Sequence, residues 1–126
     1  MSKYLSNPVI NHITVAVSNL ETSKSFYDQA LAPLGIKRVF DGDIYCGYGV
    51  DRPFFWIAQE DWQSKVHVAF EAKSKEGVIQ FHDAAIKAGG KDNGKPGPRP
   101  EYHENYFGAF ILDPDGNNIE AVFGNG

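Results

Sequence analysis

Two segments of the chain have the alternating apolar and polar pattern of half-buried strands. In residues 13–17, isoleucine and valine occupy every second position, so one face of the segment is apolar. Residues 67–70 repeat the pattern, with Val68 and Phe70 on one face. Each segment therefore predicts a strand with one side toward a core.

A helix is expected after each of these strands. Ser18-Asn19-Leu20-Glu21 is typical of a capping box, with Ser18 at the N-cap and Glu21 reaching back, and Gly35 supplies the stop. In the second copy Ser74 opens the helix and the glycine pair 89–90 ends it. The apolar faces consist of Leu20, Tyr27, Leu31 and Leu34 in the first helix, and of Val78, Phe81, Ala85 and Ala88 in the second.

Three short strand candidates follow each helix. They cover residues 36–40, 43–48 and 54–58 in the first half, and the region near Lys91, residues 106–112 and residues 118–123 in the second. Residues 93–105 contain three prolines and are expected to form a loop, whereas Asp113-Pro114-Asp115-Gly116-Asn117 predicts a tight turn. Each half is therefore a β-α-β-β-β unit.

The two halves also resemble each other residue by residue, at an offset of about 55 positions. Residues 12–35 align with residues 67–90 without a gap. The identical pairs are His12/His67, Glu21/Glu76, Phe26/Phe81, Asp28/Asp83, Ala30/Ala85 and Gly35/Gly90. The pattern predicts an α+β fold in which residues 1–126 form one domain of two modules, about 9–60 and 65–123.

Composition narrows the possible functions. The 126 residues are 42% hydrophobic with a net charge of −4, which fits one folded domain and argues against binding of nucleic acid. Cys46 is the single cysteine, so no disulfide forms within the chain, and we interpret it as a packing residue. The absence of a leader-like segment and of about 18 consecutive apolar residues predicts a cytoplasmic protein without membrane insertion.

Three polar residues lie where strands should be apolar: His12 and His67 at matching strand starts, and Glu120 in mid-strand. Burying a carboxylate costs several kcal/mol unless a partner compensates it, and two histidines with one carboxylate form a known metal-ligand set. The alternatives are hydrogen-bonded strand histidines, a solvent-facing Glu120, and a purely structural pair of His12 with Glu120. The repeat favours metal ligation because it relates the two histidines by symmetry.

These features resemble the vicinal oxygen chelate superfamily, which includes glyoxalase I, extradiol dioxygenases, fosfomycin-resistance enzymes and bleomycin-resistance proteins. The resemblance extends from about Val9 to Phe123 and is strongest in N-H-I-T-V-A-V, V-H-V-A-F and F-I-L-D-P-D-G-N-N-I-E-A-V. It implies two modules curved into an incomplete mixed-sheet barrel around one divalent metal, iron, manganese, zinc or nickel. It also implies His12, His67 and Glu120 as ligands, a small-molecule substrate with adjacent oxygens, and a homodimer.

One departure from the family pattern concerns glyoxalase I, which has a further glutamate on the last strand of its first module. Residues 54–58 carry no carboxylate. The resemblance therefore implies a three-ligand site and argues against glyoxalase I activity itself. We expect a metal-dependent enzyme of the lyase, dioxygenase or thiol-transfer type; the alternative is a non-catalytic protein that sequesters a small molecule, as in bleomycin resistance.

Further candidates would contact the substrate. Glu120 and His103 are the candidate catalytic residues, His103 because its ordinary pKa lies near working pH, although an exposed loop histidine is the alternative. The candidate substrate-binding residues are Tyr48, Trp56, Arg99, Tyr102 and Tyr106. For the aromatic residues the alternative is packing in the core or against the loop, and for Arg99 it is a solvated surface position.

Overall fold

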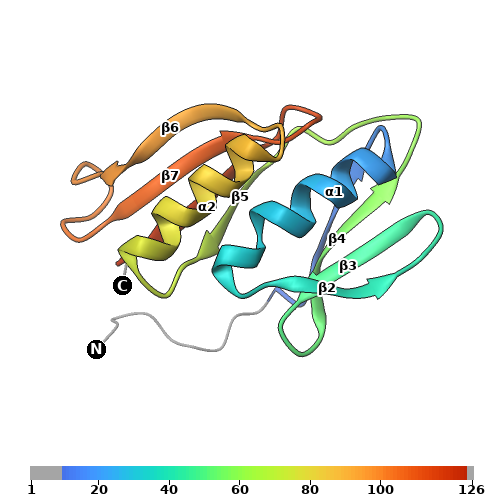
Figure 1. Ribbon diagram of the computed structural model, residues 1–126, viewed down its shortest axis with the longest axis horizontal. Helices are drawn as coiled ribbons and strands as arrows, with labels where there is room; N and C mark the ends of the chain where they lie inside the picture. The colour runs from blue at the N-terminus through green and yellow to red at the C-terminus, as the bar shows by residue number, and fades with distance from the viewer. Residues whose placement is uncertain (1–9, 125–126) are drawn as a thin grey trace.

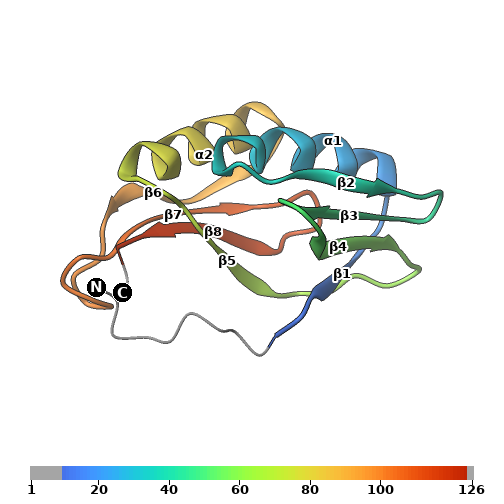
Figure 2. The same cartoon turned by 90° about the horizontal axis from the view of Figure 1, so that it is seen from below.

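The computed structural model describes residues 10–124, which form two β-sheets with both helices on the same side (Figure 1, Figure 2). The first half contains β1 (Ile13–Val17), α1 (Leu20–Ala30), a 3-10 turn (Ala32–Leu34), β2 (Lys37–Asp41), β3 (Tyr45–Gly49) and β4 (Pro53–Gln59). The second half contains β5 (His67–Glu71), α2 (Lys75–Lys87), β6 (Lys91–Pro98), β7 (Phe107–Leu112) and β8 (Asn118–Phe123). Residues 1–9, which include the expected start of the first module and in which no leader segment was expected, lie outside the described residues.

The two sheets have the same topology. Their strand orders are β1-β4-β3-β2 and β5-β8-β7-β6, and in each sheet the first strand runs parallel to the last while the other neighbours are antiparallel. This confirms the predicted α+β fold of two β-α-β-β-β units. The strands do not close into a barrel, so the side of each sheet away from the helices, here called its outer face, is not covered by a helix (Figure 2).

The N-terminus of α1 differs from the prediction. Asn19, not Ser18, is the N-cap, and its side-chain oxygen accepts the Thr22 backbone N–H at 3.0 Å. The Ser18 hydroxyl instead donates to Asp115 in the second half, at 2.6 Å. The capping-box prediction was therefore wrong by one residue, because a distant carboxylate competes for Ser18. The prediction for the second helix was correct, since Ser74 caps α2 by accepting the Gly77 N–H.

The region predicted as a loop at residues 93–105 begins instead as strand β6, which continues to Pro98. Proline cannot donate a ladder hydrogen bond, but an edge strand leaves one side of its backbone unpaired. β6 is the edge of its sheet, and its register with β7 shifts on both sides of Gly94. Edge position and bulges together accommodate prolines that would break a central strand.

The core lies between the helices and the inner faces of both sheets, and it continues from one half into the other. Phe55 of β4 and Phe70 of β5 meet edge to face, with ring centroids 5.1 Å apart. Tyr27 of α1 reaches the β7–β8 turn, where its hydroxyl donates to Asp113 at 2.5 Å. The turn itself has the predicted geometry, with Gly116 at a φ of 88°. These contacts fix the second half against the first helix.

Candidate metal and substrate site

Glu120 is a buried carboxylate on the outer face of the second sheet. Its neighbours in β8, Ile119 and Ala121, point into the core, so the pleat directs Glu120 to the opposite side. The residue is nevertheless only 2% exposed. His67 Nε2 lies 2.7 Å from one carboxylate oxygen, and the Tyr106 hydroxyl donates to the other. Both oxygens of a buried acid are therefore satisfied by side chains from two other segments.

Tyr106 keeps its proton at neutral pH. Burial is the main reason that the pKa of its hydroxyl is raised, and the hydrogen bond to Glu120 raises it further. A protonated phenol donates its hydrogen to the carboxylate oxygen. Tyr106 therefore holds Glu120 in a fixed orientation. The exposed ring of Tyr102 packs edge-on against the Tyr106 ring, with centroids 5.2 Å apart.

Phe110 and Arg99 complete this part of the outer face. Phe110 is directly opposite Glu120 in the β7–β8 ladder, and its ring centroid lies 6.0 Å from that of His67. The Arg99 guanidinium lies over Phe110, 5.5 Å from the ring centroid, and donates to the carbonyl oxygen of Lys95. Sequence reasoning missed Phe110, although its position in the ladder could have been inferred from the turn at residues 113–117.

His12 is on the first sheet, immediately before β1. Its Nδ1 lies 2.7 Å from the Asn11 side-chain oxygen, which can only accept, so the ring donates from Nδ1. A pocket of about 260 Å³ on this outer face is lined by His12, Thr14, Tyr45, Trp56 and Ala58. A second pocket, of about 320 Å³, lies at the boundary between the halves and is lined by residues of β1, β4 and β5 together with His12 and Arg52.

The expected ligand set is only partly assembled within one chain. His67 and Glu120 meet, but among residues 10–124 no three histidine, cysteine or acidic side chains are grouped to hold a metal ion. His12 therefore stands apart from the other two expected ligands. His12 directly precedes β1 of the first sheet, whereas the pair lies on neighbouring strands of the second sheet.

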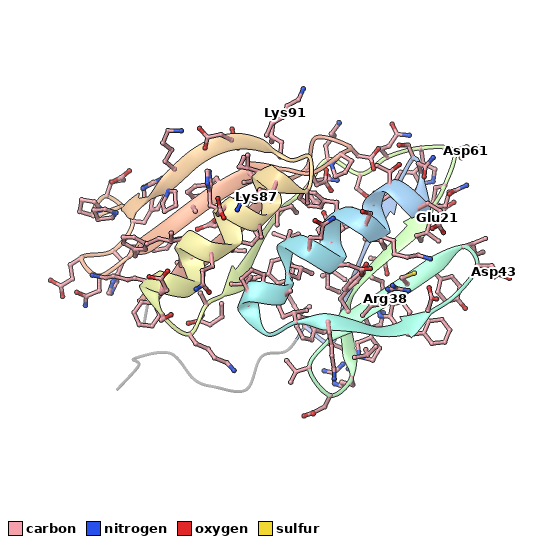
Figure 3. All side chains as sticks on the ribbon, in the orientation of Figure 1. Glu21, Arg38, Asp43, Asp61, Lys87 and Lys91 are labelled. Carbon is pink, nitrogen blue, oxygen red and sulfur yellow. The ribbon has the colours of Figure 1, made fainter. Side chains whose placement is uncertain are left out.

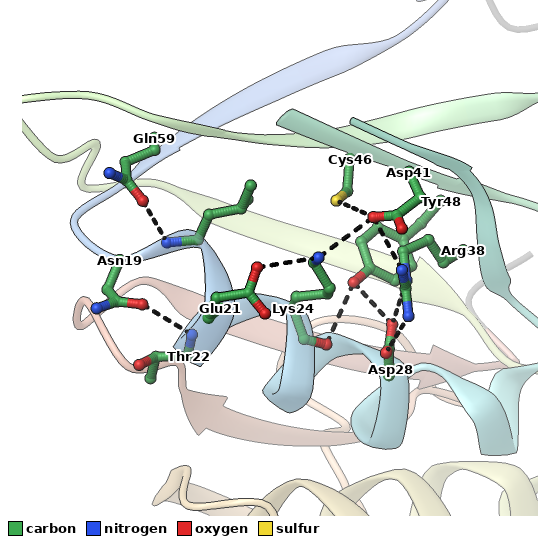
Figure 4. A network of polar contacts seen from close by, with 11 residues as sticks. Asn19, Glu21, Thr22, Lys24, Asp28, Arg38, Asp41, Cys46, Tyr48 and Gln59 are labelled. Carbon is green, nitrogen blue, oxygen red and sulfur yellow. Dashed lines mark hydrogen bonds and ion pairs between the residues drawn. The ribbon is translucent and has the colours of Figure 1, made fainter. Parts of the chain in front are cut away.

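Two other candidates form hydrogen bonds within the described part of the chain. Tyr48 is fully buried on the inner face of β3, where its hydroxyl donates to Asp28 of α1 (Figure 4). Of the two roles considered for Tyr48, its position fits core packing. His103 is half-buried in the loop after β6, and its Nδ1 accepts the Asn105 backbone N–H at 3.2 Å.

Cys46 belongs to the same polar network as Tyr48 (Figure 4). It is fully buried, and its thiol donates to Asp41 at 3.4 Å. Burial is the main cause that raises the pKa of this thiol, and Asp41 raises it as well. A raised pKa disfavours the nucleophilic thiolate, which agrees with the interpretation of Cys46 as a packing residue.

The helix-bearing side of the molecule carries charges of both signs. Figure 3 shows Glu21, Asp43 and Asp61 on the same view as Lys87 and Lys91, spread around the edges of the helices and sheets. In the described part of the chain, no helix is long and apolar enough to cross a membrane. Of the candidate site residues, Glu120 and Trp56 lie on the outer faces away from the helices, whereas Tyr48 lies on an inner face.

The fold and the paired outer faces identify the class of protein. The chain belongs to the Glyoxalase/Bleomycin resistance protein/Dioxygenase superfamily, whose family model matches residues 9–121. The expected resemblance is thereby confirmed. No curated protein matches the sequence.

Solved structures agree with this assignment. A glyoxalase/bleomycin resistance protein from Albidiferax ferrireducens T118 is 31% identical, with a TM-score of 0.79 over 93% of this chain and 99% of that one. A glyoxalase/bleomycin resistance protein/dioxygenase family enzyme from Burkholderia phytofirmans PsJN is 19% identical, with a TM-score of 0.70 over 90% and 97%. A glyoxalase I variant from Zea mays is 23% identical, with a TM-score of 0.69 over 89% of this chain and 45% of that one. The last two likenesses show the shared fold.

Proposed function

We propose that the protein is a metal-dependent vicinal oxygen chelate enzyme that acts on a small molecule with two adjacent oxygens. The observation that carries the proposal is the contact between His67 Nε2 and Glu120 Oε1 at 2.7 Å. An imidazole nitrogen and a carboxylate oxygen are directed at each other beside an open face, and both are typical metal ligands. Packing alone would not favour a carboxylate at this position, because burying a carboxylate is costly.

The residues present fit a divalent metal. His67 and Glu120 would supply two ligands, and Tyr106 holds the second carboxylate oxygen so that the first faces His67. His12 would supply the third, because donation from Nδ1 to Asn11 leaves Nε2 with its lone pair, and a hydrogen bond of this kind commonly orients a metal-bound histidine. An iron, manganese, zinc or nickel ion held there would act as a Lewis acid on the adjacent oxygens of the substrate.

The side chains around Glu120 define what the protein itself would contribute to the reaction. Tyr106 orients the carboxylate, so Glu120 can accept a substrate proton only through the oxygen that faces His67. Arg99 over Phe110 offers a positive charge at the rim for an anionic substrate group. His103 remains our candidate for a second proton-transfer group, from the loop that also carries Tyr102.

We further propose that two copies of the chain assemble each site. His12 of one copy would join His67 and Glu120 of the other, because the three are not grouped within residues 10–124. Two features support the association: the sheets are not closed, and β1 and β5 are both edge strands. A two-fold symmetric dimer would form two such sites, since each copy offers both halves.

The test is the metal content of protein purified without chelator, measured by mass spectrometry and compared with His67→Ala and Glu120→Gln. Stoichiometric metal in the wild type and its loss in both variants are expected. A wild-type protein that neither carries nor takes up a divalent ion would overturn the proposal. Ligand binding of equal strength before and after chelation would instead favour the sequestering function.

Mixing two variants tests the shared site separately. His12→Ala and Glu120→Gln each remove one ligand, and their homodimers should both lose metal. A heterodimer has one intact site if the ligands come from different copies, so refolding the two together should restore about a quarter of the wild-type metal content. No recovery in a sample whose heterodimers are confirmed by native mass spectrometry contradicts sharing.

A further inference from the structure

Trp56 occupies, in the first sheet, the position that Glu120 occupies in the second. In the parallel pair β1–β4, Trp56 is opposite Thr14; in the parallel pair β5–β8, Glu120 is opposite Ala69. Thr14 and Ala69 are two residues after His12 and His67, so the two positions correspond under the internal repeat. Where one half presents a carboxylate on its outer face, the other presents an indole.

The neighbours of these two positions are exchanged in size. Across the next strand, Glu120 faces Phe110, whereas Trp56 faces Gly47. A Cβ at Gly47 would lie 2.9 Å from the Trp56 ring, so only glycine lets the indole lie across β3. Beyond Gly47 the next residue in the ladder is Phe40, whose ring centroid lies 5.6 Å from that of Trp56. The first half has therefore replaced a ligand position by a broad aromatic surface.

Tyr45 extends this surface and gives it depth. Its ring lies nearly parallel to that of Phe40, with centroids 5.7 Å apart and planes at 17°, and edge-on to Trp56 at 5.8 Å. Thr14, Ala58 and His12 line the 260 Å³ pocket together with Tyr45 and Trp56. Phe40 and Tyr45 are each 43% exposed, so part of this aromatic surface is accessible to a ligand.

We propose that Phe40, Tyr45 and Trp56, here called the aromatic trough, bind a planar aromatic group of the substrate, so that the enzyme selects aromatic over saturated substrates. The inference rests on the proposed function, because it takes His12 and the trough to face the same bound molecule. The pocket, of about 260 Å³, has room for one small ring system. Aromatic rings prefer offset-stacked or edge-to-face partners, and the trough offers both.

The experiment compares two hydroxamates that present the same adjacent oxygens on different rings, benzohydroxamate and cyclohexanecarbohydroxamate, by calorimetry on the zinc-loaded protein. Benzohydroxamate should bind about tenfold more tightly. Trp56→Leu and Tyr45→Leu should bring the two affinities within about twofold, whereas Trp62→Leu, which removes an exposed aromatic side chain outside the pocket, should preserve the difference. Equal affinities in the wild type would overturn the inference while leaving the metal site intact.

Two further arms separate the possible failures. Benzyl alcohol and cyclohexylmethanol lack the adjacent oxygens, so their affinities test the trough even if the protein binds no metal; a preference for benzyl alcohol supports the trough and equal binding contradicts it. In a Trp62→Phe background Trp56 is the single tryptophan, and benzohydroxamate should change its fluorescence. If Trp56→Leu and Tyr45→Leu leave ligand selectivity unchanged but dissociate a dimer in light scattering, the trough is a contact between copies and the inference is wrong.

Discussion

Replacing Tyr27 by phenylalanine removes a single oxygen atom but should destabilise the protein clearly. The hydroxyl that is lost forms one of the hydrogen bonds between the two halves. Tyr27 is fully buried in α1 and donates to Asp113, which is 5% exposed in the β7–β8 turn. Burial first, and then Asp113, raise the pKa of Tyr27 well above its ordinary value, so the hydroxyl remains a donor. When the Tyr27 hydroxyl is removed, Asp113 Oδ2 still accepts a hydrogen bond from the Asn117 side-chain amide at 3.0 Å.

The magnitude follows from the kind of bond that is lost. A hydrogen bond to a charged group contributes about 1.5–3 kcal/mol, and the high end applies when the acceptor stays buried. For a chain of this length the entropy of unfolding converts 1 kcal/mol into about 4 °C. Tyr27→Phe should therefore lower the melting temperature by about 6–12 °C without a change of fold.

Thermal denaturation followed by circular dichroism measures the melting temperature, and urea denaturation measures the free energy of unfolding, with Tyr48→Phe as the matched control. Tyr48 is equally buried, and its hydroxyl donates to Asp28. Asp28, however, also accepts two hydrogen bonds from Arg38 and lies nearer to water, so losing the Tyr48 hydroxyl should cost about 1 kcal/mol. If Tyr27→Phe lowers the free energy of unfolding no more than Tyr48→Phe does, the hydrogen bond to Asp113 contributes no more than the bond to Asp28, and the prediction is wrong.

Three further predictions concern single positions. Asn19→Ala should lower the free energy of unfolding by about 1 kcal/mol in urea denaturation, because it removes the side chain that accepts the Thr22 N–H. An unchanged midpoint would mean that Asn19 does not cap the helix. His82→Leu should raise the pKa of Asp92 from about 2 toward its ordinary 3.8 in an NMR titration, because the hydrogen bond from His82 is the main cause of the low value. Since that pKa is depressed on folding, the associated stability is present above about pH 4 and lost as the pH falls toward 2, and the variant should lack this loss. Gly116→Ala should cost about 1 kcal/mol in the same denaturation assay because the residue has a φ of 88°, whereas a neutral result would mean that the turn changes its conformation.

The fold could be predicted from the sequence because its signals are local and occur twice. Alternation within residues 13–17 and 67–70 specifies strands, and the repeat shows that the two halves share one topology. The shift of the N-cap from Ser18 to Asn19 could not be predicted, since Asp115, which binds the Ser18 hydroxyl, is far away in the sequence. The extension of β6 to Pro98 could not be predicted either, because it depends on the edge position of the strand, which is a property of the whole sheet.

The candidate site was predictable only in part, for a related reason. Alternation in β3 places Tyr45 and Tyr48 on opposite faces of the strand but does not indicate which of them faces the helices. The sequence alone therefore allows Tyr48 to line a pocket. The partnership of His67 with Glu120 follows from strand neighbours in one sheet. Whether His12 joins them depends on how the halves are placed, and side-chain contacts such as that of Phe55 with Phe70 decide this.

The separate pairing of the two sheets has a consequence for how such a fold can be adapted. The described strands form two independent ladders, and the halves meet through side chains such as Phe55, Phe70 and Tyr27. The angle between the sheets can therefore change through side-chain substitutions, without breaking a ladder hydrogen bond. Each half can then diverge separately, as the indole of Trp56 and the carboxylate of Glu120 at matching ladder positions illustrate.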